Sequence, residues 1–211
     1  MPVMGTTLRE VAFETIKQKI VNGEWEGGTF LSEKRLSELL GMSKTPIRSA
    51  MDRLEMIGLV KLAPNQGVIV QELSLKKIME IYELRLSLET FAVKQLTGKM
   101  DPPFFHRLDE NLERQEHCVR EEDIVGFVQL DRTFHETIIA GLDNEEYREV
   151  MSRLQDKFLM AVRVTFYKNH NRLAGSLNEH KQIRRALEGN DPTAAEELVY
   201  HHIEFVKKIM L

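Results

Sequence analysis

The spacing of apolar residues changes once along this chain of 211 residues, near residue 72. Before that point, short helical patterns lead into the stretch LVKLAPNQGVIVQEL, in which apolar and polar residues alternate on either side of PNQG. After it, apolar residues recur every three or four positions over long segments, which is the spacing of amphipathic helices. We therefore expect a first domain at residues 1–72 and a second at residues 73–211.

Residues 6–72 are predicted to form three short helices followed by a β-hairpin. Ser32 is placed to cap a helix that Gly41 ends, and Ser43 is placed to cap the next helix. Pro46 falls in the first turn of that next helix, where its missing N–H is tolerated. Helices joined by a tight turn and followed by a hairpin are the elements of a winged helix-turn-helix.

The second domain is predicted to be helical throughout, with no strand after the hairpin. Breakers such as GKMDPP and EGNDP separate six expected helices at 74–97, 102–121, 124–140, 145–169, 176–188 and 192–210. The predicted fold class is therefore mostly α, with an N-terminal winged helix-turn-helix and a C-terminal bundle of about six to seven helices.

The composition excludes several classes of protein. No apolar run approaches the roughly 20 residues of a membrane-spanning helix, and the stretch MPVMGTTLRE lacks the order of a secretory signal. Cys118 is the only cysteine, so no internal disulfide can form. We predict a cytoplasmic protein with no membrane partner. The formal net charge of −4 means that any DNA contact must come from the placement of particular basic residues.

The helix that begins at Lys44 carries the residue types that read DNA. Its apolar stripe leaves four residues facing outward near its N-terminus: Lys44, Thr45, Arg48 and Ser49. This part of a recognition helix enters the major groove, where Arg pairs with guanine edges and the other three types bind phosphates. Lys34 and Arg35 are placed to touch the DNA backbone, and the turn at Gly67 to reach an adjacent groove. Alternatively, these residues form an ordinary solvated helix face. The hairpin that follows the helix favours the DNA-binding interpretation.

The stretch GTFLSEKRLSELLGMSKTPIRSAMDRLEMIGLV resembles the winged-helix domain of GntR-type bacterial transcription regulators. The resemblance implies DNA contact by Lys34 or Arg35 together with Ser43, Lys44, Thr45, Arg48 and Gly67. Lys44 departs from the family, which usually has Arg at this position. Because a point charge replaces a bidentate fork, a phosphate contact is expected there rather than a base contact.

The stretch FVQLDRTFHETII, residues 127–139, places Asp131 and His135 at the edge of an apolar helical face. A carboxylate near a core needs a partner. The pair is explained either by a hydrogen bond between the two side chains or by two ligands of a metal, and one helix does not decide between them.

Two more histidines are predicted to point into the bundle. His180 is in register with neighbouring apolar residues, and His202 continues a stripe that includes Val199 and Phe205, whereas His201 falls with charged residues. Three imidazoles and one carboxylate suit zinc, nickel, manganese or iron better than calcium or magnesium. Each histidine alone is also explained as an ordinary core residue with a hydrogen-bond partner. His106, His117 and His170 are assigned no role.

Three stretches of the second domain resemble the FCD domain of the FadR-type branch of the GntR family: IYELRLSLETFAVKQL, LDRTFHETII and SLNEHKQIRRALEGNDPTAAEELVYHHI. The resemblance implies a divalent metal, with zinc as the first choice, beside a cavity for a small carboxylate effector. The implied metal ligands are Asp131, His135, His180 and His202. Arg85 would clamp the effector carboxylate, with Arg163 and Asn178 as further contacts. Alternatively, Arg85 pairs with Glu89 on its own helix.

The resulting functional hypothesis is a homodimeric, metabolite-responsive transcription regulator rather than an enzyme. It would act as a repressor that the effector releases from a roughly palindromic operator. One rival is a metal-dependent hydrolase, which lacks a general base because Glu136 and Glu179 are predicted to point away from the cluster. The other rival is a regulator whose metal is purely structural.

Overall fold

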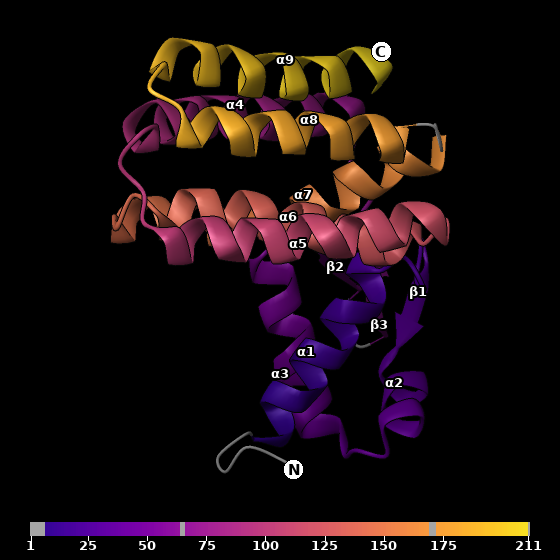
Figure 1. The fold of residues 1–211 in the computed structure, drawn as a ribbon. Helices are drawn as coiled ribbons and strands as arrows, with labels where there is room; N and C mark the ends of the chain where they lie inside the picture. The colour runs from indigo at the N-terminus through magenta and orange to yellow at the C-terminus, as the bar shows by residue number, and fades with distance from the viewer. Residues whose placement is uncertain (1–6, 64–65, 169–171, 211) are drawn as a thin grey trace. The chain divides into compact units, whose positions relative to one another are not determined.

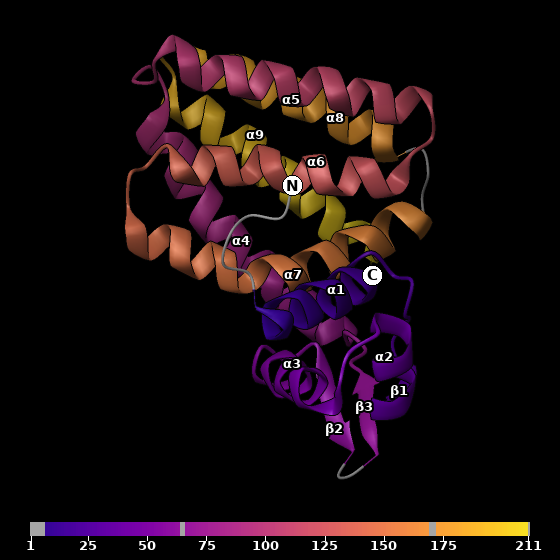
Figure 2. The same ribbon diagram turned by 90° about the horizontal axis from the view of Figure 1, so that it is seen from below.

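The computed structural model describes residues 7–63, 66–168 and 172–210. Contacts within the chain divide it into two compact units, one ending at Leu73 and the other beginning at Ser74. Figure 1 and Figure 2 show the ribbon of both units from two directions.

Among the described residues, the first unit contains three helices and a three-stranded antiparallel sheet. In chain order the elements are α1 (Leu8–Val21), β1 (Phe30–Ser32), α2 (Glu33–Leu40), α3 (Lys44–Met56), β2 (Val60–Ala63) and β3 (Gly67–Val70). The sheet order is β1-β3-β2, so β2 and β3 form the predicted hairpin and β1 pairs with its other edge. The turn predicted at PNQG includes residues 64–65, which lie outside the described residues. The sequence did not indicate β1, because three residues are too few to show an alternating pattern.

The helix boundaries in the first unit follow from local capping. The hydroxyl of Ser32 accepts a hydrogen bond of 3.1 Å from the backbone N–H of Arg35, and Gly41 ends α2 in the left-handed conformation with a φ of 62°. Ser43 occupies the N-cap position of α3, but its side chain makes no capping hydrogen bond there. The hydroxyl of Ser43 is exposed and thus remains available to a partner.

The described part of the second unit is an all-helical bundle. Its six helices are α4 (Leu75–Leu96), α5 (Pro102–Arg120), α6 (Ile124–Ala140), α7 (Glu145–Lys168), α8 (Arg172–Glu188) and α9 (Pro192–Met210). In Figure 1 they form two layers, with α4, α8 and α9 in one layer and α5, α6 and α7 in the other. The predicted fold class, mostly α with a winged helix-turn-helix and a helical bundle, is confirmed.

The start of α8 differs from the prediction. The helix was expected at 176–188 because HNRLAG looked like a breaker, but it begins four residues earlier, at Arg172. Arg172 and Leu173 are both buried, and the Arg172 guanidinium binds Glu179 two turns further along α8. Tertiary burial of this first turn thus outweighs the low helix propensity of Gly175.

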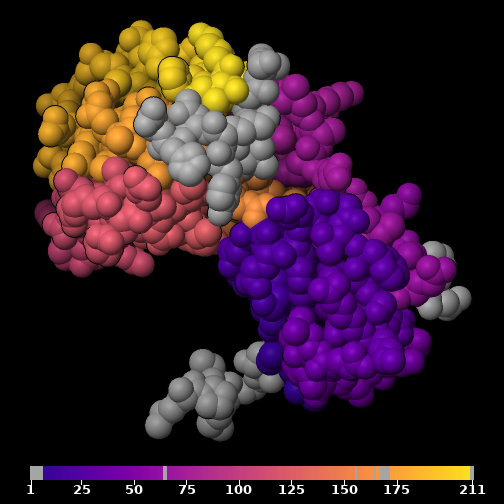
Figure 3. All heavy atoms as spheres, turned by 90° about the vertical axis from the view of Figure 1, so that its right-hand side faces the viewer, coloured from indigo at the N-terminus to yellow at the C-terminus, as the bar shows by residue number. Residues whose placement is uncertain are grey.

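The helices of the second unit are closely packed around a core that is not purely apolar. In the space-filling view of Figure 3, the orange-to-yellow surface of α8 and α9 is continuous with the rose surface of α5 and α6. Large aromatic residues such as Phe104, Phe127 and Phe134 fill the interior. Charged and polar side chains are buried beside them, which is where a functional site is expected. None of the described helices combines the length and the apolar character that crossing a membrane requires.

Gly67 allows β3 to approach β1 closely. It lies opposite Ser32 in the antiparallel register, its φ is +149°, and a Cβ built on it would lie 2.1 Å from the carbonyl oxygen of Leu31. We expect Gly67→Ala to force the strands apart and to lower the free energy of unfolding of the first unit by about 1–3 kcal/mol. Urea unfolding followed by the fluorescence of Trp25, the only tryptophan, measures this change.

Gly41→Ala is the matched control for this prediction. Gly41 has a φ of +62°, but no heavy atom lies within 4 Å of a Cβ built there. Its substitution disfavours only the backbone conformation, at a cost of about 1 kcal/mol. Equal destabilisation by the two substitutions would show that the close approach to β1 is not what Gly67 provides.

Candidate metal centre and nucleic-acid interface

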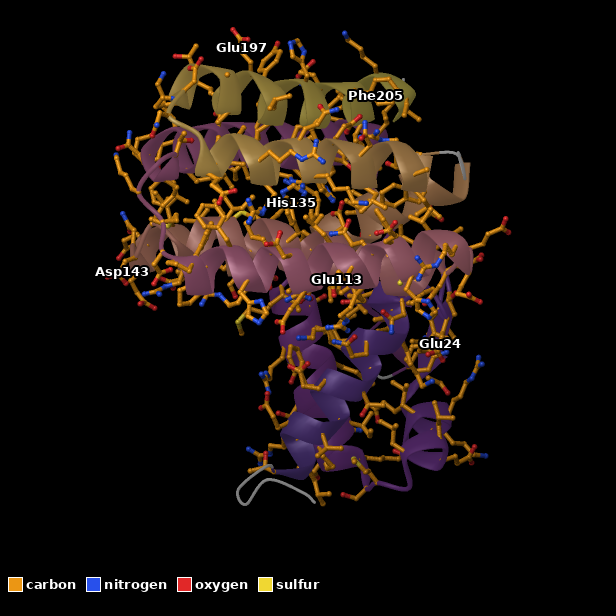
Figure 4. All side chains as sticks on the ribbon, in the orientation of Figure 1. Glu24, Glu113, His135, Asp143, Glu197 and Phe205 are labelled. Carbon is orange, nitrogen blue, oxygen red and sulfur yellow. The ribbon has the colours of Figure 1, made fainter. Side chains whose placement is uncertain are left out.

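Four side chains that were predicted to point inward lie together inside the bundle. Two come from α6, one from α8 and one from α9, namely Asp131, His135, His180 and His202, and each is at most 2% exposed. One ligand atom of each residue lies within 4.8 Å of those of the other three. Figure 4 shows His135 between the two layers of helices. The neighbouring His201 is exposed, so helical periodicity distinguished the two histidines correctly.

Distances at the centre of this cluster argue against a simple local pair on α6. Asp131 Oδ1 lies 3.9 Å from His135 Nε2, which is too far for a hydrogen bond, and 3.4 Å from His180 Nε2. The Nε2 atoms of His135 and His180 are 3.2 Å apart. The other carboxylate oxygen of Asp131 is buried without a hydrogen-bond partner among the described residues. A buried carboxylate oxygen of this kind fits a cation site.

The electrostatics of the cluster suit metal ligands. Burial raises the pKa of Asp131 to about 6, against the lowering effect of the nearby Arg85 guanidinium. Burial also lowers the pKa of His135 and of His180 well below the usual value, and it lowers that of His202. Neutral imidazoles keep a lone pair for a metal, and three nitrogens with one carboxylate form a donor set suited to zinc and to the other transition metals predicted above.

Arg85 lies beside the cluster and pairs with Glu89, the alternative considered from the sequence. Its Nε donates to Glu89 Oε1, and its guanidinium carbon lies 4.0 Å from the centre of the Phe158 ring. Arg85 is only 3% exposed, yet its Nη2 has no hydrogen-bond partner among the described residues. The guanidinium therefore retains donor capacity for an anion, and effector binding by Arg85 stays a prediction.

The two weaker effector candidates, Arg163 and Asn178, differ in burial. Arg163 is partly buried on α7, and Asn178 is exposed on α8. No contact found among the described residues joins either side chain to the cluster. Their part in effector binding remains a prediction from resemblance.

Three residues that sequence reasoning did not assign to the site contact its imidazoles. Gln115 Oε1 lies 2.8 Å from His180 Nδ1, and Glu179 Oε2 lies 2.6 Å from His202 Nδ1. Glu89 Oε2 lies 2.5 Å from His135 Nδ1, within ion-pair distance, although the two atoms are not aligned for a hydrogen bond. Sequence spacing gave no signal for Gln115, because its partner is on another helix.

The prediction that Glu179 points away from the cluster was wrong. Its carboxylate binds His202 and also accepts two hydrogen bonds from Arg172, at 2.7 and 2.5 Å. Although burial raises the pKa of Glu179, the hydrogen bonds from His202 and Arg172 outweigh burial and lower the pKa to about 2. Such an acidic and fully engaged carboxylate is a poor general base. Glu136, the other candidate base, pairs with Arg132.

The predicted DNA-reading residues are exposed around the N-termini of α2 and α3, except for Gly67 and for Ser49, which is half-buried on α3. The exposed set consists of Lys34, Arg35, Ser43, Lys44, Thr45 and Arg48. Arg48 Nε donates to Glu33 Oε1 at 2.9 Å, so the guanidinium is already oriented across the turn between the two helices. Gly67 is buried in β3, and its DNA contact stays a prediction.

A winged helix-turn-helix followed by a separate helical domain is the architecture of a DNA-binding regulator. The family model for bacterial regulatory proteins of the gntR family matches residues 8–70, and the model for the FCD domain matches residues 80–205. The chain belongs to the GntR family of bacterial transcription regulators, in the FadR-type branch that carries an FCD domain, and this is not a family of enzymes.

Named relatives and solved structures are similar over nearly the whole chain. The gluconate operon transcriptional repressor of Bacillus subtilis (strain 168) is 31% identical over 185 residues, which cover 86% of this chain and 75% of the relative. The transcriptional repressor RspR of Escherichia coli (strain K12) is 22% identical over 196 residues, covering 93% and 86%. The structure of E. coli McbR/YncC has a TM-score of 0.84 at 22% identity and covers 98% of both chains. A GntR regulator from Rhodococcus sp. RHA1 has a TM-score of 0.86 at 22% identity, covering 97% and 98%. These two structures show the shared fold.

Adjacent histidines on α9 provide a matched pair of variants for the metal centre. His202→Ala removes one of the four candidate ligands, so we expect this variant to retain much less divalent metal than the wild type after purification. His201→Ala removes an exposed imidazole one position away and should leave the metal content unchanged. Elemental analysis after dialysis against zinc measures both. Equal metal content in the two variants would place the metal elsewhere.

Proposed function

We propose that this chain is a dimeric transcriptional repressor that a small carboxylate releases from its operator. A DNA-binding domain at residues 1–72 would hold the operator, and a domain at residues 73–211 would hold a divalent metal and the effector. The observation that carries the proposal is the buried cluster of Asp131 and three histidines. The names of two relatives as transcriptional repressors support the direction of regulation.

Zinc is the first candidate for the metal, with nickel, manganese or iron as alternatives. Support comes from the neutral imidazoles and from the unpartnered oxygen of Asp131. When bound, the ion would supply positive charge and open coordination positions for a carboxylate. The chain would supply the four ligands and a dry, shaped surrounding, in which the Phe134 ring stacks on His180 with the ring centres 4.5 Å apart.

The effector is proposed to be a small hydroxylated carboxylate held between the metal and Arg85. A recess between α4, α6 and α7 is lined by apolar side chains and by two polar pairs. The apolar residues are Ile81, Met151, Leu154 and Phe158, and the polar ones are Arg85 with His135 and Arg132 with Glu136. One turn before His180, the hydroxyl of Ser176 is buried without a hydrogen-bond partner among the described residues. Buried donors and acceptors of this kind suit a ligand with both a carboxylate and hydroxyl groups. The gluconate operon repressor as a relative supports the same class, the sugar acids.

Release from DNA would follow from linkage between the two sites. An effector shifts the equilibrium between DNA-competent and DNA-incompetent states only by its difference in affinity for them. Buried contacts that form with an effector carboxylate in only one of the two states would provide such a difference.

Homodimerisation is proposed through an apolar surface on α4 and α7, two helices that pack against each other. Leu84 is 39% exposed, Phe91 is 44% exposed and Val150 is 37% exposed, and the Phe91 ring stacks on Tyr147 with the ring centres 5.4 Å apart. Exposed apolar patches mark interaction surfaces. A second copy of the chain fits this patch, because a palindromic operator needs two recognition helices.

A reciprocal pair of arginine variants tests DNA binding and effector response separately. The operator is first enriched from random duplexes with the wild-type protein. Arg48→Ala should lose about 1–3 kcal/mol of operator affinity, because a bidentate base contact is removed. Arg85→Lys should bind the operator as the wild type does, because the positive charge opposite Glu89 is kept. It should bind the effector carboxylate more weakly, because an ammonium group does not form the bidentate hydrogen bonds of a guanidinium.

Release of labelled operator by a panel of sugar acids and other carboxylates is then measured by fluorescence anisotropy. We expect at least one member of the panel to release the wild type and to release Arg85→Lys only at a much higher concentration. Equal release of both proteins would remove Arg85 from the effector site. If no carboxylate released the wild type and chelation alone unfolded the bundle, the metal would be structural.

Phe91→Glu should convert the dimer to a monomer, because a charge would be buried at the interface. Light scattering coupled to size-exclusion chromatography measures the mass. Val125→Glu is the matched control, since Val125 is 39% exposed on α6, outside the proposed surface. A dimer that persisted in Phe91→Glu would exclude this surface of α4 and α7.

A further inference from the structure

We propose that Asn111 and Gln115 of α5 are positioning residues of the metal centre: they form a hydrogen-bond relay that directs the lone pair of His180 Nε2 into the cluster. Neither residue is itself a candidate ligand. The effect on metal affinity rests on the proposed metal function, whereas the orientation of His180 does not.

The relay begins at a backbone carbonyl of α6. Asn111 Nδ2 donates to the carbonyl oxygen of Leu130 at 3.1 Å. A carbonyl oxygen only accepts, so the Asn111 amide must present its nitrogen to Leu130 and its oxygen away from it. The relay thus starts from the residue next to Asp131, which belongs to the cluster.

The second step orients Gln115. Its Nε2 donates to Asn111 Oδ1 at 2.6 Å, one turn back along α5. Because the nitrogen of the Gln115 amide is used in this bond, the oxygen is the atom that faces His180 Nδ1, at 2.8 Å. An amide alone has two orientations, and the carbonyl of Leu130 selects one of them through Asn111.

The third step sets the tautomer of His180. Gln115 Oε1 only accepts, so His180 Nδ1 must carry the proton. In a neutral imidazole the other nitrogen, Nε2, then carries the lone pair. That atom faces Asp131 Oδ1 at 3.4 Å and His135 Nε2 at 3.2 Å. The relay therefore presents an acceptor, not a donor, to the cluster.

Burial disfavours the alternative amide orientations and the alternative tautomer of His180. Gln115 and His180 are 0% exposed and Asn111 is 5% exposed, so water does not compete for these bonds. Reversing either amide would place two acceptors, or two donors, against each other in the core. A single tautomer of His180 is the arrangement that satisfies all three side chains.

The other two imidazoles have a carboxylate close to the corresponding atom. His202 Nδ1 lies 2.6 Å from Glu179, and His135 Nδ1 lies 2.5 Å from Glu89 without ideal alignment. The Glu179 carboxylate places the proton of His202 on Nδ1, so its Nε2 is an acceptor like that of His180. His180 Nε2 also lies 3.2 Å from His135 Nε2, where its lone pair is open either to a cation shared by the two imidazoles or to a proton on His135.

Variants at Gln115 test the relay. Gln115→Leu removes the acceptor, whereas Gln115→Glu keeps one. Long-range ¹H–¹⁵N spectra of the metal-free protein should show a single tautomer of wild-type His180, with the proton on Nδ1, and lose it in Gln115→Leu. Zinc affinity, measured by competition with a chelator, should fall roughly 10–100-fold in Gln115→Leu and much less in Gln115→Glu.

Cys118→Ala is the matched control, because Cys118 is 7% exposed on the same helix and its thiol lies 3.9 Å from Asp123 Oδ2 rather than against the imidazoles. It should leave both the tautomer and the zinc affinity unchanged. If Gln115→Leu does not fold, Asn111→Leu is used in its place. Without Asn111 the Gln115 amide has no fixed orientation, so we expect a mixture of His180 tautomers.

Two results would overturn the proposal: a proton on Nε2 of His180 in the metal-free wild type, or zinc affinity in Gln115→Leu equal to that of Cys118→Ala. A wild type that showed the Nδ1 proton but bound no zinc would support the relay and contradict the metal function.

Discussion

Burying four titratable side chains between two layers of helices is the constraint on which the second domain depends. Burial disfavours the charged forms of the three imidazoles and raises the pKa of Asp131 to about 6. An uncharged imidazole still has one N–H to donate and one lone pair to direct, so each needs an acceptor nearby. The acceptors come from α4, α5 and α8, and the cluster itself from α6, α8 and α9. The polar centre thereby specifies how five of the six described helices of the bundle meet.

The same contacts connect the proposed effector site with the metal site. Glu89 pairs with Arg85 and also lies against His135, so one carboxylate touches both the proposed effector clamp and a proposed ligand. Glu179 likewise connects two partners, because its carboxylate binds both Arg172 and His202. The Arg172 guanidinium lies 4.7 Å from the centre of the Phe205 ring. Such shared partners let occupancy of one site change the free energy of the other, and linkage makes that change reciprocal.

Much of this arrangement could be predicted because it depends on local periodicity. Helical spacing selected His202 over its neighbour, and capping residues located the start and end of α2. Phe205, which the same periodicity placed in the apolar stripe, is 50% exposed. The start of α8 was missed because the burial of Arg172 and its bond to Glu179, rather than local propensity, extend the helix.

By itself, the sequence determined the two-part organisation, the helical bundle and the four side chains that face its interior, because turns, caps and helical repeats act over a few residues. Only the tertiary structure decided what surrounds those side chains. The strand β1 exists through its pairing with β3, and Gln115 reaches His180 across 65 positions of the chain. The orientation of an amide or the tautomer of an imidazole depends on which atom of another helix lies within hydrogen-bond distance, and spacing along one helix carries no record of that.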